Sequence, residues 1–169
     1  MYFKHTSQTR SDIDLPVRMI DPLCTTYNNG NKAMFCDRSS VITCWRFNGT
    51  SVERVADPEF WHDQGAMTHW NEDPIVIGGY GIQVETFNGT LQWNREEDLP
   101  ATDPEWTYIE YHSAVNFKNH VYVFGGRFTD YLRRDNAQRA VFQFNGAWTR
   151  IQNLAGFRYG HRQSCHSAG

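Results

Sequence analysis

Short apolar runs separated by turn residues recur along this chain, and the pattern is clearest in its last third. Residues 121–124, Val-Tyr-Val-Phe, form a continuous β-branched and aromatic run closed by Gly125-Gly126, which is typical of a buried strand. Lys118-Asn119 and Asn145-Gly146 supply turns on either side of it. The pattern predicts four antiparallel strands, a to d, joined as hairpins: residues 111–117, 121–124, 140–144 and 147–151.

The same order of strands and turns occurs twice upstream. In the second unit an apolar run ends at the double glycine Gly78-Gly79, whereas Cys36-Asp37 takes that place in the first unit. The predicted strands of the second unit are residues 65–70, 74–79, 82–87 and 91–93. Those of the first unit are residues 23–27, 33–36, 41–47 and 52–55. The whole pattern therefore predicts an all-β fold.

The tripeptide Phe-Asn-Gly marks the c–d turn of every unit, at residues 47–49, 87–89 and 144–146. Its recurrence at a spacing of about forty to sixty residues indicates a repeat architecture. Asn-Gly is the favoured pair for a two-residue hairpin turn, so we expect short and nearly invariant c–d turns. We also expect the aromatic residue before the turn and the tryptophan after it to pack across the sheet and fill space between units.

These features together resemble the kelch repeat. The matching positions are Phe47, Gly49, Gly78, Gly79, Phe87, Gly89, Trp93, His112, Gly125, Gly126, Phe144, Gly146 and Trp148. The resemblance covers about residues 23–165, with Phe-Asn in place of the commoner Tyr-Asp, and with neither Gly-Gly nor tryptophan in the first unit. It implies a β-propeller built of four-stranded antiparallel blades, and protein-interaction scaffolds as the functional class.

The resemblance also sets the expected organisation. Residues 1–22 are a lead-in segment, residues 23–57, 58–104 and 105–157 are about three blades, and residues 158–169 start a truncated further blade. Because kelch propellers usually close with six blades, we predict a partial propeller. We expect the chain to be a fragment, or to complete its ring by self-association or with another chain, because two inter-blade faces stay open.

Two long connections fall on the same end of the predicted sheets, opposite the c–d turns: the b–c loop at residues 127–139 and the d–a connection at residues 94–110. Function tends to lie on loops displayed by a rigid scaffold, so this end is the predicted partner-binding face. The candidate residues are Arg127, Asp130, Tyr131, Arg133, Arg134 and Asp135. Their arginines and tyrosine suit an acidic peptide. The alternative is that the basic first loop and the acidic second loop neutralise each other or are simply solvated.

Composition restricts the class of partner. The 169 residues carry a net charge of −3, which provides no basic field for nucleic acid or an anionic membrane. No stretch approaches the ~18 apolar residues of a membrane-spanning helix. Residues 1–14 contain no apolar run resembling a signal peptide. The location stays open between cytoplasmic and, if the N-terminus is incomplete, extracellular.

The four cysteines and two sequons each leave alternatives open. Cys36 and Cys44 flank a predicted hairpin and can form a cross-strand disulfide, or both can remain half-buried thiols. No pair has Cys-x-x-Cys spacing, which argues against a zinc site. Asn48 and Asn88 begin formal glycosylation sequons, but they also lie in turns that favour Asn-Gly without any modification.

No catalytic, cofactor or metal site is predicted. The densest group of metal-ligand residue types is His161, Cys165 and His166, which lies on a predicted strand start, where their spacing does not gather them on one side. His62-Asp63 with His69 has no nucleophile and orienting partner beside it.

The predicted function is a non-enzymatic protein-interaction module. Trp61 and Trp106 lie in d–a connections, outside the repeat positions, and are available for carbohydrate stacking. An extracellular adhesion or glycan-binding domain is therefore the alternative. The resemblance also admits a substrate adaptor of a ubiquitin ligase and a propeller enzyme, although nothing in residues 1–18 resembles the extra domain that such adaptors carry.

Overall fold

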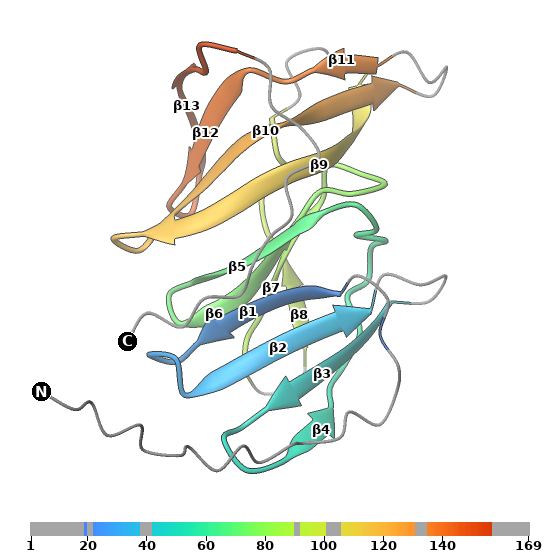
Figure 1. Cartoon of the computed structure of the whole chain (residues 1–169), viewed down its shortest axis with the longest axis vertical. Helices are drawn as coiled ribbons and strands as arrows, with labels where there is room; N and C mark the ends of the chain where they lie inside the picture. Colours follow the sequence, from blue (N-terminus) through green and yellow to red (C-terminus); the bar gives the residue numbers. More distant parts are fainter. Residues whose placement is uncertain are drawn as a thin grey trace, which may run out of the picture.

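The structure is a computed structural model, which describes residue 19 and residues 22–37, 42–89, 92–100, 106–130 and 135–156. This described part is built of strands and turns, arranged as three sheets that follow one another along the long axis of the molecule (Figure 1). It contains no helix of the length and apolar character needed to cross a membrane. The predicted all-β class is confirmed.

Each sheet is an antiparallel meander in chain order. The first consists of β1 (Leu23–Tyr27), β2 (Lys32–Asp37), β3 (Thr43–Phe47) and β4 (Val52–Arg54). The second consists of β5 (Ala66–Trp70), β6 (Asp73–Ile77), β7 (Val84–Phe87) and β8 (Trp93–Arg95). The third contains β9 (Trp106–Phe117), β10 (His120–Asp130), β12 (Ala140–Phe144) and β13 (Trp148–Asn153). A short extra strand, β11 (Asp135–Ala137), pairs with the far end of β10.

The third sheet differs from the prediction at its long strands. The double glycine Gly125-Gly126 was expected to end strand b, but β10 continues past it to Asp130. Its partner β9 begins at Trp106 instead of residue 111, and Arg127 lies opposite Glu110. Both strands pass the glycines because Gly126 and Tyr111 take matching positive φ values, 84° and 56°, so the pairing resumes without a register shift there. Much of the two predicted loops is therefore strand.

Buried and half-buried positions alternate along β1 and β12, whereas β6 and β7 of the second sheet are buried at nearly every position, and the buried faces meet in two cores. Met34 and Cys44 of the first sheet pack with Met67, Val76 and Phe87 of the second. On its other side the second sheet packs against the third, through a core that includes Ile75, Ile77, Val84, Val121, Val123, Phe142 and Phe144. The first strands of the sheets, β1, β5 and β9, contact one another in succession. The second sheet is thus covered on both faces.

The tryptophans after the second and third c–d turns link neighbouring sheets in the same way. The Nε1 of Trp93 donates a 2.8 Å hydrogen bond to the carbonyl of Ala56, just after the first sheet. The Nε1 of Trp148 donates an equally short bond to the carbonyl of Glu97, just after the second. Each indole also packs on its cross-strand phenylalanine, with centroids 5.3 Å apart for Phe87 and Trp93. The predicted aromatic pairing across the sheet is confirmed.

The c–d turns lie where predicted but are not the expected two-residue Asn-Gly turns. The three turns differ in length, so they are not invariant. Four residues lie between the paired residues Phe47 and Val52, five between Phe87 and Trp93, and three between Phe144 and Trp148. Only the glycine of each Asn-Gly pair has positive φ, whereas a type I′ turn needs it at both central residues.

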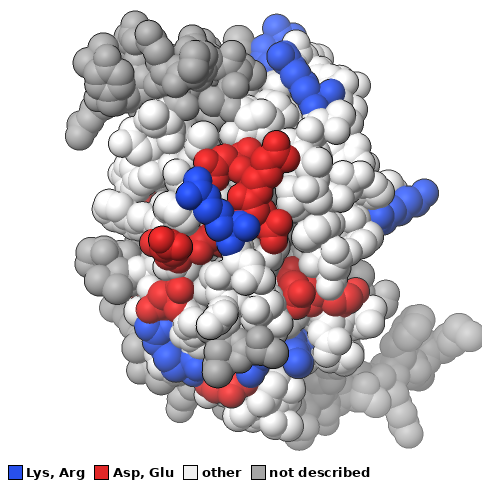
Figure 2. Space-filling model, turned by 180° about the vertical axis from the view of Figure 1, so that it is seen from behind, with Lys and Arg blue, Asp and Glu red and all other residues white. Residues whose placement is uncertain are grey.

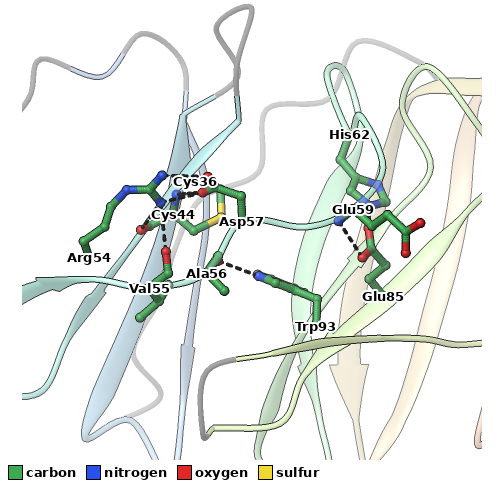
Figure 3. The surroundings of a disulfide bond; sticks show 10 residues. All are labelled: Cys36, Cys44, Arg54, Val55, Ala56, Asp57, Glu59, His62, Glu85 and Trp93. Atoms are coloured by element: carbon green, nitrogen blue, oxygen red, sulfur yellow. Dashed lines mark hydrogen bonds and ion pairs between the residues drawn. A yellow bond between two sulfur atoms is a disulfide. The ribbon is translucent and has the colours of Figure 1, made fainter.

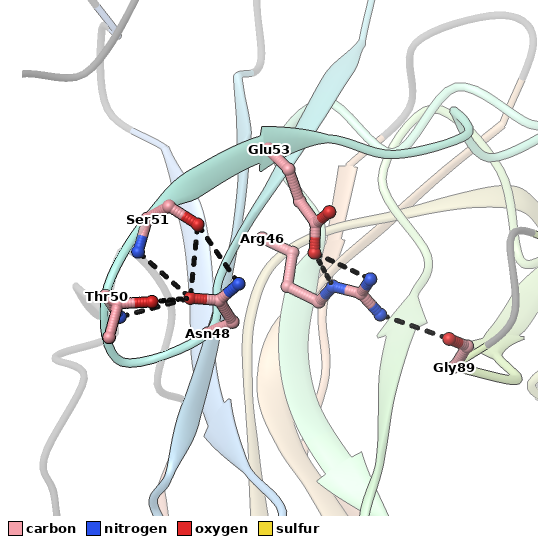
Figure 4. A network of polar contacts seen from close by, with 6 residues as sticks. All are labelled: Arg46, Asn48, Thr50, Ser51, Glu53 and Gly89. Atoms are coloured by element: carbon pink, nitrogen blue, oxygen red, sulfur yellow. Dashed lines mark hydrogen bonds and ion pairs between the residues drawn. The ribbon is translucent and has the colours of Figure 1, made fainter.

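The first c–d turn is instead organised by the side chain of Asn48 (Figure 4). Its Oδ1 accepts bonds from the backbone N–H of Thr50 at 3.1 Å and of Ser51 at 2.9 Å. This is the local side-chain to backbone bonding for which asparagine is selected at turns. Figure 4 also shows Arg46, which pairs with Glu53 and reaches across to the carbonyl of Gly89 in the next sheet at 3.1 Å.

The true two-residue turns are the a–b turns, at Asn71-Glu72 and Lys118-Asn119, where both residues have positive φ. These turns touch each other: the backbone N–H of Asn71 donates to Oδ1 of Asn119 at 3.0 Å. The Asn29 N–H likewise donates to the Glu72 carboxylate at 2.6 Å. A chain of turn contacts therefore joins the three sheets at the end opposite the b–c and d–a connections.

Candidate functional site

The connection between the first two sheets, residues 55–65, is held on both sides (Figure 3). On one side, Cys36 and Cys44 form a disulfide across β2 and β3, so of the two alternatives for these cysteines the structure has the bridge. The backbone N–H of Cys44 donates to Asp57, which also accepts from Nη2 of Arg54 at 2.6 Å. Together with the Trp93 bond described above, these contacts fix the start of the connection.

The other side of the connection is fixed by Glu85, a buried carboxylate of β7. Its two oxygens accept bonds from the backbone N–H groups of Glu59 at 2.9 Å and Phe60 at 3.0 Å. Glu85 also lies 2.8 Å from Nε2 of His62, which is buried as well. Nδ1 of His62 lies 2.7 Å from the Gly78 carbonyl, so each ring nitrogen lies within hydrogen-bond distance of an oxygen. Buried polar groups are stable when they are hydrogen-bonded in this manner.

Trp61 lies between these tethered residues and points its large ring into solvent, with 50% of its surface exposed. Tyr80, which follows the double glycine of the second sheet, is 44% exposed and contacts Trp61 with ring centroids 4.9 Å apart. Tyr80 also contacts Tyr108 of β9, at 6.2 Å. We call Trp61, Tyr80 and Tyr108 the aromatic cluster. It lies on a d–a connection, a b–c connection and a strand that begins beside them.

The position of Tyr80 is fixed by its glycine neighbours. The Gly79 N–H donates to the Ile109 carbonyl at 2.8 Å, and the Ile109 N–H donates to the Gly81 carbonyl at 3.2 Å. A side chain at Gly79 is sterically excluded, because its Cβ would lie 2.4 Å from the carbonyl oxygen of Asp63. The Tyr80 loop is therefore bound directly to β9, which places Tyr80 beside Tyr108.

Next to the aromatic cluster, Arg127 is held by two neighbours. Its Nε and Nη2 lie 3.1 and 2.9 Å from Oε2 of the buried Glu110, and its guanidinium lies 4.9 Å from the ring centroid of Tyr111. Tyr111 has φ 56°, a sparsely populated conformation for an aromatic residue, and its N–H donates to Gln64, which has φ 62°. Such strained residues concentrate at functional sites. Both residues with this strained backbone, Tyr111 and Gln64, lie at the end of the molecule that carries the b–c and d–a connections.

Beneath the surface, His112 of β9 is buried against the double glycines. Cβ atoms built at Gly78 and Gly126 would lie 2.9 Å from its Cε1 and 2.7 Å from its Cβ. Burial lowers the pKa of His112 to about 4, and the nearby His62 acts in the same direction. The Ile77 and Ile109 carbonyls near the ring oppose this shift, although neither ring nitrogen makes a hydrogen bond of good geometry within the described residues. The ring is therefore neutral at pH 7.

The predicted partner-binding residues are only partly placed. Arg127 and Asp130 belong to β10 and Asp135 to β11, so they are strand residues and not loop residues. Tyr131, Arg133 and Arg134 lie outside the described residues. Since Arg127 pairs with Glu110, one arginine of the predicted basic loop is neutralised by the acidic stretch, as the alternative expected.

The structure does not bring the other candidate catalytic residues together. His62 pairs with Glu85 and not with Asp63 or His69. His161, Cys165 and His166 lie outside the described residues, and no metal-binding group of three His, Cys, Asp or Glu residues occurs in the part that the structure describes. Of the two tryptophans outside the repeat positions, Trp61 is exposed as carbohydrate stacking requires, and Trp106 begins β9.

Sequence reasoning missed Glu85, Tyr80 and Tyr108. Glu85 had one signal, since it is a charged residue within the otherwise uncharged strand Val84–Phe87. Tyr80 and Tyr108 have none, because their contact depends on how one sheet packs on the next. No family model matches the sequence, and no curated protein is significantly similar to it.

Proposed function

We propose that this chain is a partial β-propeller of the kelch type and acts as a non-enzymatic protein-interaction module. The arrangement of the sheets supports the propeller: each is a four-stranded meander, and the first strands β1, β5 and β9 contact one another, as the innermost strands of blades do. The repeated Trp93 and Trp148 bonds support equivalent packing of successive blades.

The binding face in this proposal is the end that carries the b–c and d–a connections. One observation carries it: Trp61 and Tyr80 are about half exposed although both lie on backbone fixed by hydrogen bonds. Rigid, exposed aromatic side chains are the usual anchors of protein interfaces, because burying them on binding costs little conformational entropy. The strained backbone at Tyr111 lies at the same end.

Selection of ligands from a random peptide library on the immobilised chain tests this function. We expect enriched peptides whose affinity falls at least about tenfold on Trp61→Ala or Tyr80→Ala, as for interface hot spots. The matched control is Phe117→Ala, which removes an aromatic ring that is 58% exposed at the other end of β9. Failure to enrich any peptide, or loss of binding on Phe117→Ala alone, contradicts the proposal.

An extracellular adhesion or glycan-binding domain is the second candidate, and the disulfides favour it. Cys36 and Cys44 are bridged, Cys24 is also disulfide-bonded, and no described cysteine is a free thiol. Disulfides persist in oxidising compartments. Asn48 is exposed at its turn, as an acceptor for glycosylation has to be. For this candidate, chain secreted from eukaryotic cells should give a crosslinked Cys36–Cys44 peptide and a glycan on Asn48. Alkylation of both cysteines without prior reduction would contradict it.

A further inference from the structure

We propose that the aromatic cluster binds a basic, proline-rich segment of a partner protein in the polyproline II conformation. This inference rests on the proposed function, since it names the class of partner for the same face. Three features of the site support this inference. They are the angles between the rings, the hydrogen bonds that the neighbouring polar groups already make, and the charge of the residues that flank Trp61.

The rings of the cluster pack on one another at an angle and do not form a flat platform. The planes of Trp61 and Tyr80 meet at 44°, and those of Tyr80 and Tyr108 meet at 85°. Proline-rich segments dock on aromatic side chains, and here the exposed surfaces of Trp61 and Tyr80 can pack against pyrrolidine rings. One polyproline II turn is about 9 Å long. The ring centroid of Tyr80 lies 4.9 Å from that of Trp61 and 6.2 Å from that of Tyr108, so the three rings together can span a comparable length.

The polar groups near the cluster suit a peptide better than a sugar. A sugar needs several side chains to bond its hydroxyls, but Glu110 is already engaged by Arg127. A polyproline II peptide has no internal hydrogen bonds and presents its carbonyls to the surface that it contacts. The indole N–H of Trp61 makes no hydrogen bond within the described residues, and it can donate to such a carbonyl.

The charge of the surrounding chain selects basic residues in the partner. Two carboxylate residues flank Trp61 in the chain, Glu59, which is exposed, and Asp63, which is half-exposed. The nearest arginines in the sequence, Arg54 and Arg95, are paired with Asp57 and Asp98. Seen from behind, acidic side chains also gather around a basic one in the middle of the molecule (Figure 2). A lysine or arginine flanking the prolines therefore meets a complementary charge.

The connection that holds Trp61 is also organised before binding. Trp61 lies between Phe60, whose N–H is bound to Glu85, and His62, whose ring is bound to Glu85 and to Gly78. A polyproline II segment is itself pre-ordered. Since neither side has much conformational freedom to lose, a small contact area gives measurable affinity.

The test titrates three repeat peptides into the full chain labelled with fluorotryptophan, with the Trp61 resonance assigned by Trp61→Phe. The probes are repeats of Pro-Pro-Arg, of Pro-Pro-Glu and of Gly-Gly-Arg. We expect Pro-Pro-Arg to shift the Trp61 resonance saturably and to bind at least about tenfold more tightly than both others. The glutamate probe isolates the charge, and the glycine probe isolates the polyproline II conformation.

Variants test whether Pro-Pro-Arg binding depends on the aromatic cluster or on another part of the surface. Tyr80→Ala and Trp61→Ala should each weaken Pro-Pro-Arg binding at least about tenfold, whereas Phe117→Ala should leave it unchanged. Equal binding of Gly-Gly-Arg, preference for Pro-Pro-Glu, or no binding by any probe overturns the inference. So does an oligosaccharide that competes at Trp61. If library selection still yields peptides that depend on Trp61, the proposed function stands and only the partner class is wrong.

Discussion

At the scale of single residues, Glu85 decides where the Trp61 connection lies, because its carboxylate binds two backbone N–H groups and the ring of His62. We expect Glu85→Gln to destabilise the protein by about 3 kcal/mol or more, since it leaves buried donors without a matching acceptor. Urea unfolding of both proteins measures this. The same change at Glu53, in a partly exposed pair with Arg46, should cost less than about 1 kcal/mol. Equal costs would contradict the anchoring role.

His112 predicts how the stability depends on pH. Its pKa is lowered to about 4 in the folded protein, whereas an unfolded histidine titrates near ~6.5. Between these pH values the unfolded chain binds the proton more readily than the folded protein does. The stabilisation that neutral His112 contributes is therefore complete above about pH 6.5 and is lost as the pH falls toward 4. The full loss is about 3 kcal/mol.

Unfolding free energies at pH 7.5 and pH 5, compared with those of His112→Gln, isolate this contribution from other titrating groups. The wild type should lose more stability than the variant over that interval. An identical loss in both proteins would show that His112 does not carry the pH dependence.

At the scale of elements, the double glycine is needed where it meets the preceding connection. Gly79 has φ 103°, and a Cβ there would lie 2.4 Å from the Asp63 carbonyl oxygen and 2.6 Å from the carbonyl carbon of His62. We expect Gly79→Ala to destabilise by about 3 kcal/mol or more, because the obstructing atoms are backbone.

Gly30→Ala is the matched control, since Gly30 has φ 77° with nothing within 4 Å of a built Cβ. It should cost only about 1 kcal/mol, the cost of the backbone conformation alone. Thermal unfolding of the two variants separates the clash from the conformational cost. Similar losses would show that the close approach at Gly79 is unimportant.

Much of the element pattern can be predicted from the sequence because it is local. The run Val121–Phe124, the turns at Asn71 and Lys118, and the Phe-Trp pairs follow from period, turn chemistry and cross-strand neighbours. The continuation of β10 past Gly126 could not be predicted, because a double glycine ordinarily ends a strand and its matching residue, Tyr111, is not glycine.

The candidate site was predicted only in its general location. The expected end, with the b–c and d–a connections, is where Trp61 and Tyr80 lie, and at that end Arg127 contacts Tyr111. The aromatic cluster itself joins residues from different sheets, and Glu85 and His62 are 23 residues apart. Contacts of that range depend on how whole sheets pack, which a local pattern does not encode.

At the scale of the whole molecule, the outer face of the third sheet predicts self-association. Ala114 belongs to the core, so Val115 and Phe117 alternate onto the face turned away from the second sheet, and they are 45% and 58% exposed. Exposed apolar sheet faces favour pairing with another surface. We expect the sedimentation coefficient to rise with protein concentration, and Val115→Lys with Phe117→Lys to suppress this rise. A wild type that stays monomeric throughout contradicts the expectation, and Trp61→Lys serves as the control that should still associate.

The central claim is that the aromatic cluster is the surface that a partner covers. Hydroxyl-radical footprinting tests it most directly, because it reports the solvent exposure of individual aromatic side chains. The chain is labelled with and without a peptide selected from the random library. The account predicts protection of Trp61 and Tyr80 with unchanged labelling of Phe117. Unchanged labelling of Trp61 and Tyr80, with protection of Phe117 instead, would contradict it.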